Sequence, residues 1–130
     1  MIFGVGTDIV RVARLQDALA RHGERFAARL LDESELDDYR RAPDPARFLA
    51  KRFAAKEAFG KALGTGVAEP ATLHAVRVTH DARGKPLFGY GPALAEHMRA
   101  EGLHAHLSLS DEAEYVVAFA VIEHLSAQSV

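Results

Sequence analysis

The segment at residues 45–63 carries the clearest helix signals of this 130-residue chain. Asp44 is a favoured N-cap residue and Pro45 fits the first helical position, while Gly64 suits the position after the last turn. When the segment is projected at about 100° per residue, its large apolar side chains fall in one broad arc. The sequence therefore predicts a helix of about five turns with a wide apolar face.

The remaining segments mix strand and helix patterns. Strands are expected at 1–10, 73–78, 87–90, 104–111 and 115–123, and helices at 11–22, 24–31, 32–41 and 92–101. The first strand is expected to be buried, and the last two are expected to pair as an antiparallel hairpin. This mixed order favours an α+β fold with a mainly antiparallel sheet, as a single domain at 1–125 followed by a loose tail at 126–130.

Composition and charge exclude several classes of protein. The chain has no cysteine, so it has no disulfide framework or thiolate nucleophile, and any metal must bind oxygen or imidazole. No apolar stretch is long enough to span a bilayer and no signal sequence opens the chain, so we expect a cytoplasmic protein that does not enter membranes. A net charge of −2 argues against nucleic acid as a partner.

Positive charge is nevertheless concentrated in one stretch. Residues 40–61 hold seven basic and two acidic side chains, a local balance of +5. Within that stretch, Arg52 and Lys56 fall inside the apolar arc, where their stems either cover apolar surface or bring cations to an anion in a cleft. Glu57 and Lys61 stand four residues apart and form either a local ion pair or part of a phosphate site.

A single carboxylate, Asp8, follows Gly4-Val5-Gly6-Thr7 at the end of the first expected strand. An unpaired carboxylate is costly to bury in such a place. Asp8 therefore either caps the helix that follows or joins Glu57 in an oxygen-only pair. Such a pair suits Mg²⁺, which commonly takes one or two protein carboxylates and completes its shell with water and substrate phosphate.

Basic residues also recur along the first helical region. Arg14, Arg21 and Arg25 lie close to whole turns apart if the helix passes through Gly23. The resulting stripe is either a solvated face or a docking surface for an acidic protein. His104 and His106 alternate along an expected strand and lack the spacing of a zinc site, so we assign them no metal.

Four motifs together resemble one known family. They are GVGTDIV at 4–10, RFLAKRFAAKEAFGKALGTG at 47–66, GKP at 84–86 and HLSLSD at 106–111. The combination is similar to the holo-[acyl-carrier-protein] synthase family, the small bacterial 4′-phosphopantetheinyl transferases. The resemblance implies a Mg²⁺-dependent transfer of the 4′-phosphopantetheine arm of coenzyme A to a serine of apo acyl carrier protein. Adenosine 3′,5′-bisphosphate would be released, in a step of fatty acid and lipid biosynthesis.

The resemblance also implies roles for particular residues. Asp8 and Glu57 match the family's metal ligands, and Lys61 matches a lysine placed near the diphosphate, which makes Glu57 and Lys61 the implied catalytic pair. The implied coenzyme A contacts are Arg52, Lys56, Lys61, Gly64, Thr65, Lys85 and Pro86, and the implied carrier-protein docking residues are Arg14, Arg21, Arg25 and Phe26. Family members are homotrimers with active sites between subunits, which suits a chain too small to enclose a deep site alone.

Three points stay open from the sequence. The serine proton goes either to Glu57 or to a metal-bound water. Asp111, where many relatives carry histidine, either acts through a neighbouring group or begins a turn. A noncatalytic trimeric binding module would have the same helix pattern, whereas a Mg²⁺-dependent nuclease is disfavoured because the usual Glu-x-Lys spacing is absent at Glu57.

Overall fold

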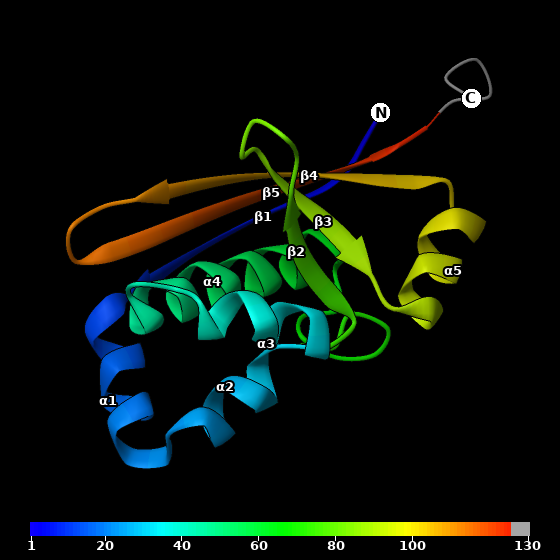
Figure 1. The fold of residues 1–130 in the computed structure, drawn as a ribbon. Helices are drawn as coiled ribbons and strands as arrows, with labels where there is room; N and C mark the ends of the chain where they lie inside the picture. The colour runs from blue at the N-terminus through cyan, green and yellow to red at the C-terminus, as the bar shows by residue number, and fades with distance from the viewer. Residues whose placement is uncertain (126–130) are drawn as a thin grey trace.

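A long central helix organises the molecule. The computed structural model describes residues 1–125, and the tail expected at 126–130 lies outside that range. Helix α4 (Pro45–Leu63) runs through the middle of the fold (Figure 1). The Asp44 carboxylate accepts a hydrogen bond from the Arg47 backbone N–H at the N-terminus, and Gly64 caps the C-terminus in a left-handed conformation. The predicted bounds of this helix are confirmed.

A three-stranded antiparallel sheet covers one side of α4. Its order is β1-β5-β4, formed by β1 (Ile2–Arg11), β5 (Tyr115–His124) and β4 (Leu103–Asp111). The expected β4–β5 hairpin is confirmed, with Leu107 paired to Ala120. The inward residues of β5, including Ala118 and Ile122, are fully buried. The core therefore lies between this sheet and α4.

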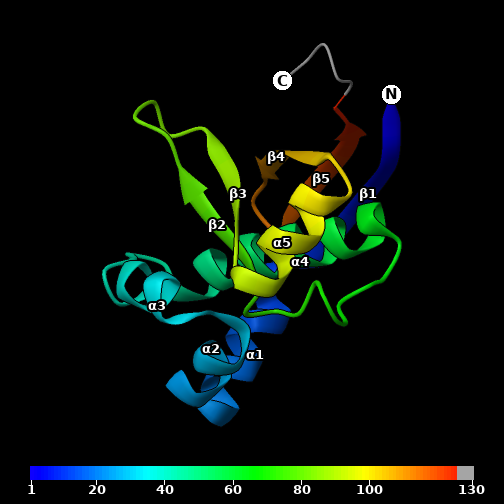
Figure 2. The ribbon, with the colours of Figure 1, turned by 90° about the vertical axis from the view of Figure 1, so that its right-hand side faces the viewer.

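The other helices and a second, two-stranded sheet lie on the opposite side and at the far end of α4. Helices α1 (Val12–His22), α2 (Glu24–Leu30) and α3 (Glu33–Arg40) lie on the side away from the sheet (Figure 1), whereas α5 (Pro92–Ala100) lies at the other end. Strands β2 (Val76–His80) and β3 (Pro86–Tyr90) form a hairpin that rises apart from the main sheet (Figure 2). Phe59 anchors the hairpin by packing edge-on against Phe88 at 4.9 Å. The fold is α+β with antiparallel sheets, as predicted.

Two glycines allow β1 to lie directly against the backbone of α4. A Cβ atom at Gly4 would collide with the carbonyl of Ala62, and one at Gly6 would collide with the carbonyl of Ala58. At Gly6 the added atom would also lie 2.7 Å from the Ala62 backbone nitrogen. The close approach explains why the strand begins with alternating glycines. It also fixes which part of α4 faces Asp8, two residues further along the strand.

The outward face of β1 differs from the sequence prediction. We expected a buried strand, but β1 is an edge strand whose outward apolar side chains are largely exposed. Val5 is 56% exposed, Ile9 is 63% exposed, and Phe119 on the neighbouring strand β5 is 45% exposed. We call Val5, Ile9 and Phe119 the outer sheet face. An apolar strip of this kind on a sheet indicates a contact surface.

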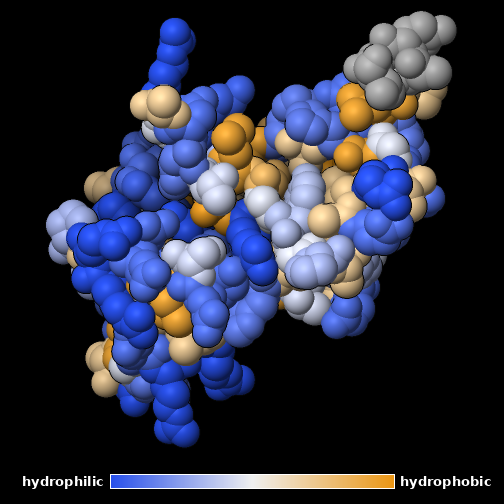
Figure 3. Space-filling model, turned by 45° about the vertical axis from the view of Figure 1, so that its right-hand side comes forward, coloured by the Kyte–Doolittle hydropathy of each residue, from blue (hydrophilic) through white to orange (hydrophobic). Residues whose placement is uncertain are grey.

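The helical end of the molecule has a different surface. Hydrophilic residues dominate the lower left of Figure 3, and hydrophobic residues gather only in small patches there. Within residues 1–125, none of the helices combines the length and the apolar character that a membrane span requires.

Candidate active site

The structure brings Asp8, Glu57 and Lys61 together where β1 crosses α4. Asp8 lies on the inward face of β1, and Lys61 reaches across from α4 to donate to its Oδ1 at 3.2 Å and to the Thr7 carbonyl at 2.9 Å. Lys61 thus pairs with Asp8 rather than with Glu57, so the alternative of a local helix ion pair is wrong. Helix α1 has Arg11 as its N-cap and no side-chain cap, so Asp8 does not cap it either.

The charges at this site favour a cation. Partial burial raises the pKa of Glu57 first, and the nearby negative charge of Asp8 raises it further, against the lowering effects of Lys61 and Arg14. Burial and the neighbouring Asp8 thus both disfavour the charged form of Glu57, and nearby positive charge would favour it. A divalent cation would supply that charge.

The donor set fits a hard divalent cation such as magnesium. Asp8 and Glu57 offer only carboxylate oxygens, the hard ligands that Mg²⁺ prefers. Within residues 1–125, no third histidine, cysteine, aspartate or glutamate joins them in a metal-binding group. Two protein ligands leave positions for water and for the phosphate oxygens of a substrate, which is the usual arrangement for Mg²⁺. The residues therefore fit the ion that the sequence implies.

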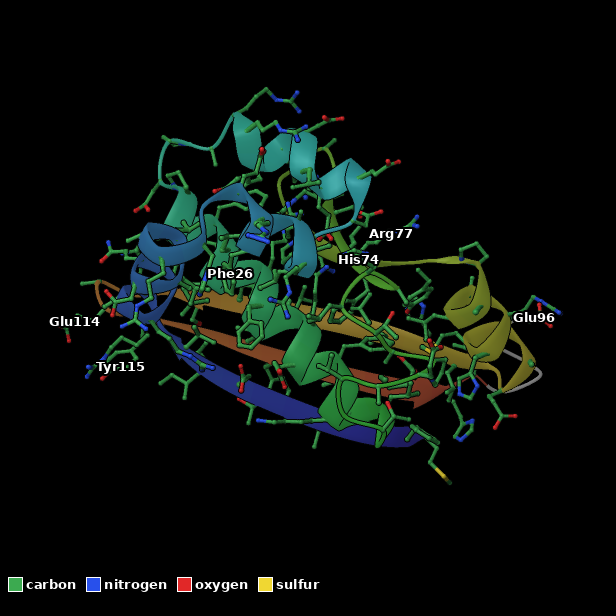
Figure 4. The ribbon with its side chains drawn as sticks, turned by 90° about the horizontal axis from the view of Figure 1, so that it is seen from below. Phe26, His74, Arg77, Glu96, Glu114 and Tyr115 are labelled. Carbon is green, nitrogen blue, oxygen red and sulfur yellow. The ribbon has the colours of Figure 1, made fainter. Side chains whose placement is uncertain are left out.

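A pocket of about 430 Å³ opens beside this site between α1, α2 and α4, and we call it the α1–α2 pocket. It is lined by Arg14, Leu15, Ala18, His22, Phe26, Arg29, Leu30, Phe53 and Leu73. Phe26 lies at the helical side of the molecule (Figure 4). The Arg14 guanidinium lies 5.6 Å above the Phe53 ring, and its charge lowers the pKa of Glu57. The pocket thus adjoins the carboxylate pair, and sequence reasoning missed its members Phe53 and Leu73.

The predicted basic stripe is broken in the structure. Gly23 adopts a φ of 62° and separates α1 from α2, so the helix does not pass through it. Arg14 and Arg21 lie on α1, whereas Arg25 lies on α2. All three arginines are exposed, so they remain free to meet a partner on this end of the molecule.

Arg52 and Lys56 are not placed to bind coenzyme A. Their charged groups are buried and pair with Glu35, which is 1% exposed: Arg52 Nη1 donates to its Oε2 at 3.1 Å, and Lys56 Nζ donates to its Oε1 at 2.6 Å. Both cations lie away from solvent and their charge is taken up by Glu35, although Arg52 also borders a smaller pocket beside Phe48 and His80. We withdraw the two residues from the coenzyme A site.

Sequence reasoning also missed Glu35, which was expected on a solvated acidic face. Its carboxylate accepts from the Asp32 backbone N–H at 3.2 Å, and the Asp32 carboxylate accepts from the Glu35 backbone N–H at 3.1 Å. This capping box was visible as an acidic pair three residues apart. A second signal for the role of Glu35 was the position of Arg52 and Lys56: two cations in an apolar arc need a buried anion as a partner.

The other implied coenzyme A contacts lie on two separate elements. Gly64 and Thr65 follow α4, where the Thr65 hydroxyl donates to the Gly66 carbonyl. Lys85 and Pro86 stand at the turn into β3, where the Lys85 backbone N–H donates to the Asp81 carboxylate. Both pairs of residues are at least partly accessible, and their role stays a proposal.

Asp111 does more than begin a turn. It ends β4, and its carboxylate pairs with Arg47 and with Lys51 Nζ, the latter at 2.9 Å. Partial burial alone would raise the pKa of Asp111, but hydrogen bonds and charge from Lys51 and Arg47 lower it overall. The residue therefore ties the end of the β4–β5 hairpin to the first turns of α4.

Comparison with known proteins places this chain in one superfamily. The chain belongs to the 4′-phosphopantetheinyl transferase superfamily, whose model matches residues 4–120. Within that superfamily its similarity is to holo-[acyl-carrier-protein] synthases. It is 69% identical to the one from Aromatoleum aromaticum and 68% identical to the one from Azoarcus sp., in both cases over 95% of this chain and 98% of the relative.

Solved structures agree with this placement. The holo-[acyl-carrier-protein] synthase from Neisseria meningitidis superposes with a TM-score of 0.91 at 46% identity, over 95% of this chain and 99% of that one. The enzyme from Bacillus anthracis, in complex with CoA (3′,5′-ADP), superposes with a TM-score of 0.80 at 33% identity, over 95% and 98%. The enzyme from Helicobacter pylori, in complex with coenzyme A, gives 0.79 at 27% identity, over 92% and 99%.

Proposed function

We propose that the protein transfers the 4′-phosphopantetheine arm of coenzyme A to a serine of apo acyl carrier protein, with Mg²⁺, giving holo carrier protein and adenosine 3′,5′-bisphosphate. The observation that carries the proposal is the meeting of Asp8, Glu57 and Lys61 at the β1–α4 crossing. The names of its relatives and the coenzyme A complexes of its structural neighbours support it. The proposal extends to a cytoplasmic role in fatty acid biosynthesis. Incubation with coenzyme A, Mg²⁺ and apo carrier protein, followed by intact mass spectrometry, tests the reaction.

The proposed roles follow from the charges. Asp8 and Glu57 would hold Mg²⁺, and the chemistry that the ion would supply is neutralisation of the coenzyme A diphosphate, which makes its phosphorus easier to attack. Lys61 is half exposed, so its ammonium can turn from Asp8 to the oxygens of the leaving phosphate. Glu57 holds its ligand position only when ionised, which its raised pKa makes dependent on nearby positive charge. Lys61 together with Gly64, Thr65, Lys85 and Pro86 forms the proposed coenzyme A contact set.

The outer sheet face supports a homotrimer with sites between subunits. Val5, Ile9 and Phe119 expose apolar area that a second copy of the chain would cover. We expect the protein to sediment at three times its chain mass of 14.1 kDa. Sedimentation equilibrium measures this directly, and a single species of one chain mass at micromolar concentration would rule the trimer out.

Carrier-protein docking is proposed at Arg14, Arg21, Arg25 and Phe26. Arg14 and Phe26 line the α1–α2 pocket, and Arg21 and Arg25 are exposed on the two helices that form it. Acyl carrier protein is expected to be acidic, so this end of the molecule would attract it at low salt.

Reversing that charge is expected to weaken docking. In Arg14→Glu/Arg21→Glu, the KM for carrier protein should rise by about 10-fold or more at low ionic strength, and the difference from the unaltered protein should shrink as salt is added. The KM for coenzyme A should change much less, and only through the influence of Arg14 on the pKa of Glu57. The matched control is Arg83→Glu, which reverses a charge in the β2–β3 turn. A carrier-protein KM that charge reversal leaves unaltered at low salt contradicts this docking surface.

A further inference from the structure

A fully buried lysine stands next to the candidate metal ligand Glu57 and has no part in the proposed chemistry. Lys56 Nζ donates to Glu35 Oε1 at 2.6 Å, to the Leu30 carbonyl at 2.9 Å and to the Leu73 carbonyl at 2.6 Å. An ammonium has three N–H donors, so every one of them is used. Burial lowers the pKa of Lys56, and the charge and hydrogen bond of Glu35 oppose that effect.

Two of the three acceptors belong to walls of the α1–α2 pocket. Leu30 is the last residue of α2, and Leu73 lies in the segment that joins α4 to β2. Both residues line the pocket, with Phe53 of α4. One ammonium therefore fastens two separate walls of the pocket to α4.

The same helix carries the carboxylate at the next position. Glu57 lies about 100° further around α4 and faces β1, where Asp8 and Lys61 meet. The pocket walls and the carboxylate pair are thus set by adjacent residues of one helix.

We propose that Lys56 is a positioning residue that holds the α1–α2 pocket in a fixed place relative to Asp8 and Glu57. The inference rests on the proposed function, because it takes the pocket to be where the carrier protein docks. A carrier serine must reach a coenzyme A phosphorus near the carboxylate pair, and a misplacement of about 1 Å can cost about 100-fold in rate. Loosening of the two walls would therefore impair use of the carrier protein more than binding of coenzyme A.

The chemistry of the site calls for an ammonium in particular. A small group that donates in three directions can serve a carboxylate and two backbone carbonyls at once. Methionine would fill the same space but offers no donor, so the carbonyls of Leu30 and Leu73 would lose their partner. The planar fork of arginine would not reproduce the three directions.

Arg52 offers a matched control within the same buried cluster. It also donates to Glu35 and is 4% exposed, yet its polar contacts within residues 1–125 go to the carboxylates of Glu35 and Asp38 and not to the pocket walls. Arg52→Met therefore disturbs the buried charges but leaves Leu30 and Leu73 fastened to α4.

The test compares Lys56→Met with Arg52→Met in steady-state transfer assays and in hydrogen exchange. Both variants should unfold at lower temperature than the unaltered protein. Only Lys56→Met should raise the KM for carrier protein, by about 10-fold, while its KM for coenzyme A stays within about two-fold. Only Lys56→Met should speed amide exchange in the segment around Leu73.

If Lys56→Met does not fold, Lys56→Gln replaces it, because its amide has only two N–H donors and cannot serve Glu35 and both backbone carbonyls at once. An unchanged carrier-protein KM in a folded Lys56 variant, or equal effects of Lys56→Met and Arg52→Met, overturns the inference. Absence of transfer by the unaltered protein instead overturns the proposed function. In that case hydrogen exchange still decides whether Lys56 holds the pocket walls, and equal exchange in both variants rejects it.

Discussion

Glu57→Gln is expected to lower kcat/KM for phosphopantetheine transfer by about 1000-fold, which corresponds to about 4 kcal/mol of transition-state stabilisation. The substitution keeps the shape of the side chain and removes the charge that holds the cation beside Asp8. Burial and the charge of Asp8 raise the pKa of Glu57, so a cation bound there would favour its ionised form. Intact mass spectrometry of the carrier protein over a time course measures the loss.

Two further variants complete this experiment. Asp8→Asn removes the other ligand charge and should cause a loss of similar size. Glu96→Gln is the matched control, because Glu96 lies on α5 at the far end of the molecule (Figure 4) and pairs only with Arg99 among the described residues. Transfer at the normal rate by Glu57→Gln with added Mg²⁺ would refute the assignment of the metal site.

Gly6→Ala is expected to destabilise the fold by about 3 kcal/mol, the upper part of the range for overpacking a core. The added methyl group would meet the Ala58 carbonyl, and it would lie 2.7 Å from the Ala62 backbone nitrogen and 2.9 Å from Lys61 Cβ. The strand must therefore move away from α4. Since Asp8 follows on the same face of β1, the movement also separates it from Glu57 and Lys61, so transfer should fall as well.

Chemical denaturation at one fixed protein concentration measures this change, because assembly makes apparent stability depend on concentration. Gly89→Ala is the control: a Cβ there would meet its nearest neighbours, Arg77 and Thr79, at 3.7 Å, an ordinary contact. Equal stability of Gly6→Ala and Gly89→Ala would contradict the close packing of β1 on α4.

Local signals in the chain account for much of the fold. Asp44, Pro45 and Gly64 act within a few residues of themselves, so both ends of α4 follow directly from the sequence. The alternation of polar and apolar residues in β4 likewise matches its exposed and buried positions. The pairing of Asp8 with Glu57 was also predicted, but as one of two alternatives, because sequence spacing does not show whether the two residues meet. The close packing of Gly6 on Ala58 brings Asp8 to α4.

The features that the sequence did not predict depend on contacts between distant elements. The position of Arg52 and Lys56 in an apolar arc does not reveal what their charged groups contact. The position of α3 decides that Glu35 lies against them. The exposure of Val5 and Ile9 depends on α4 packing against only one face of the sheet, which hydrophobicity does not predict; Phe119 on the central strand is exposed for the same reason.

One measurement tests the central claim most directly. Apo acyl carrier protein is incubated with coenzyme A, Mg²⁺ and the unaltered protein, and its intact mass is recorded, with a chelator and a carrier protein lacking the acceptor serine as controls. We predict a gain of one phosphopantetheine mass on the acceptor serine, lost in both controls, with release of adenosine 3′,5′-bisphosphate. A folded protein that leaves the carrier mass unchanged under these conditions would contradict the account.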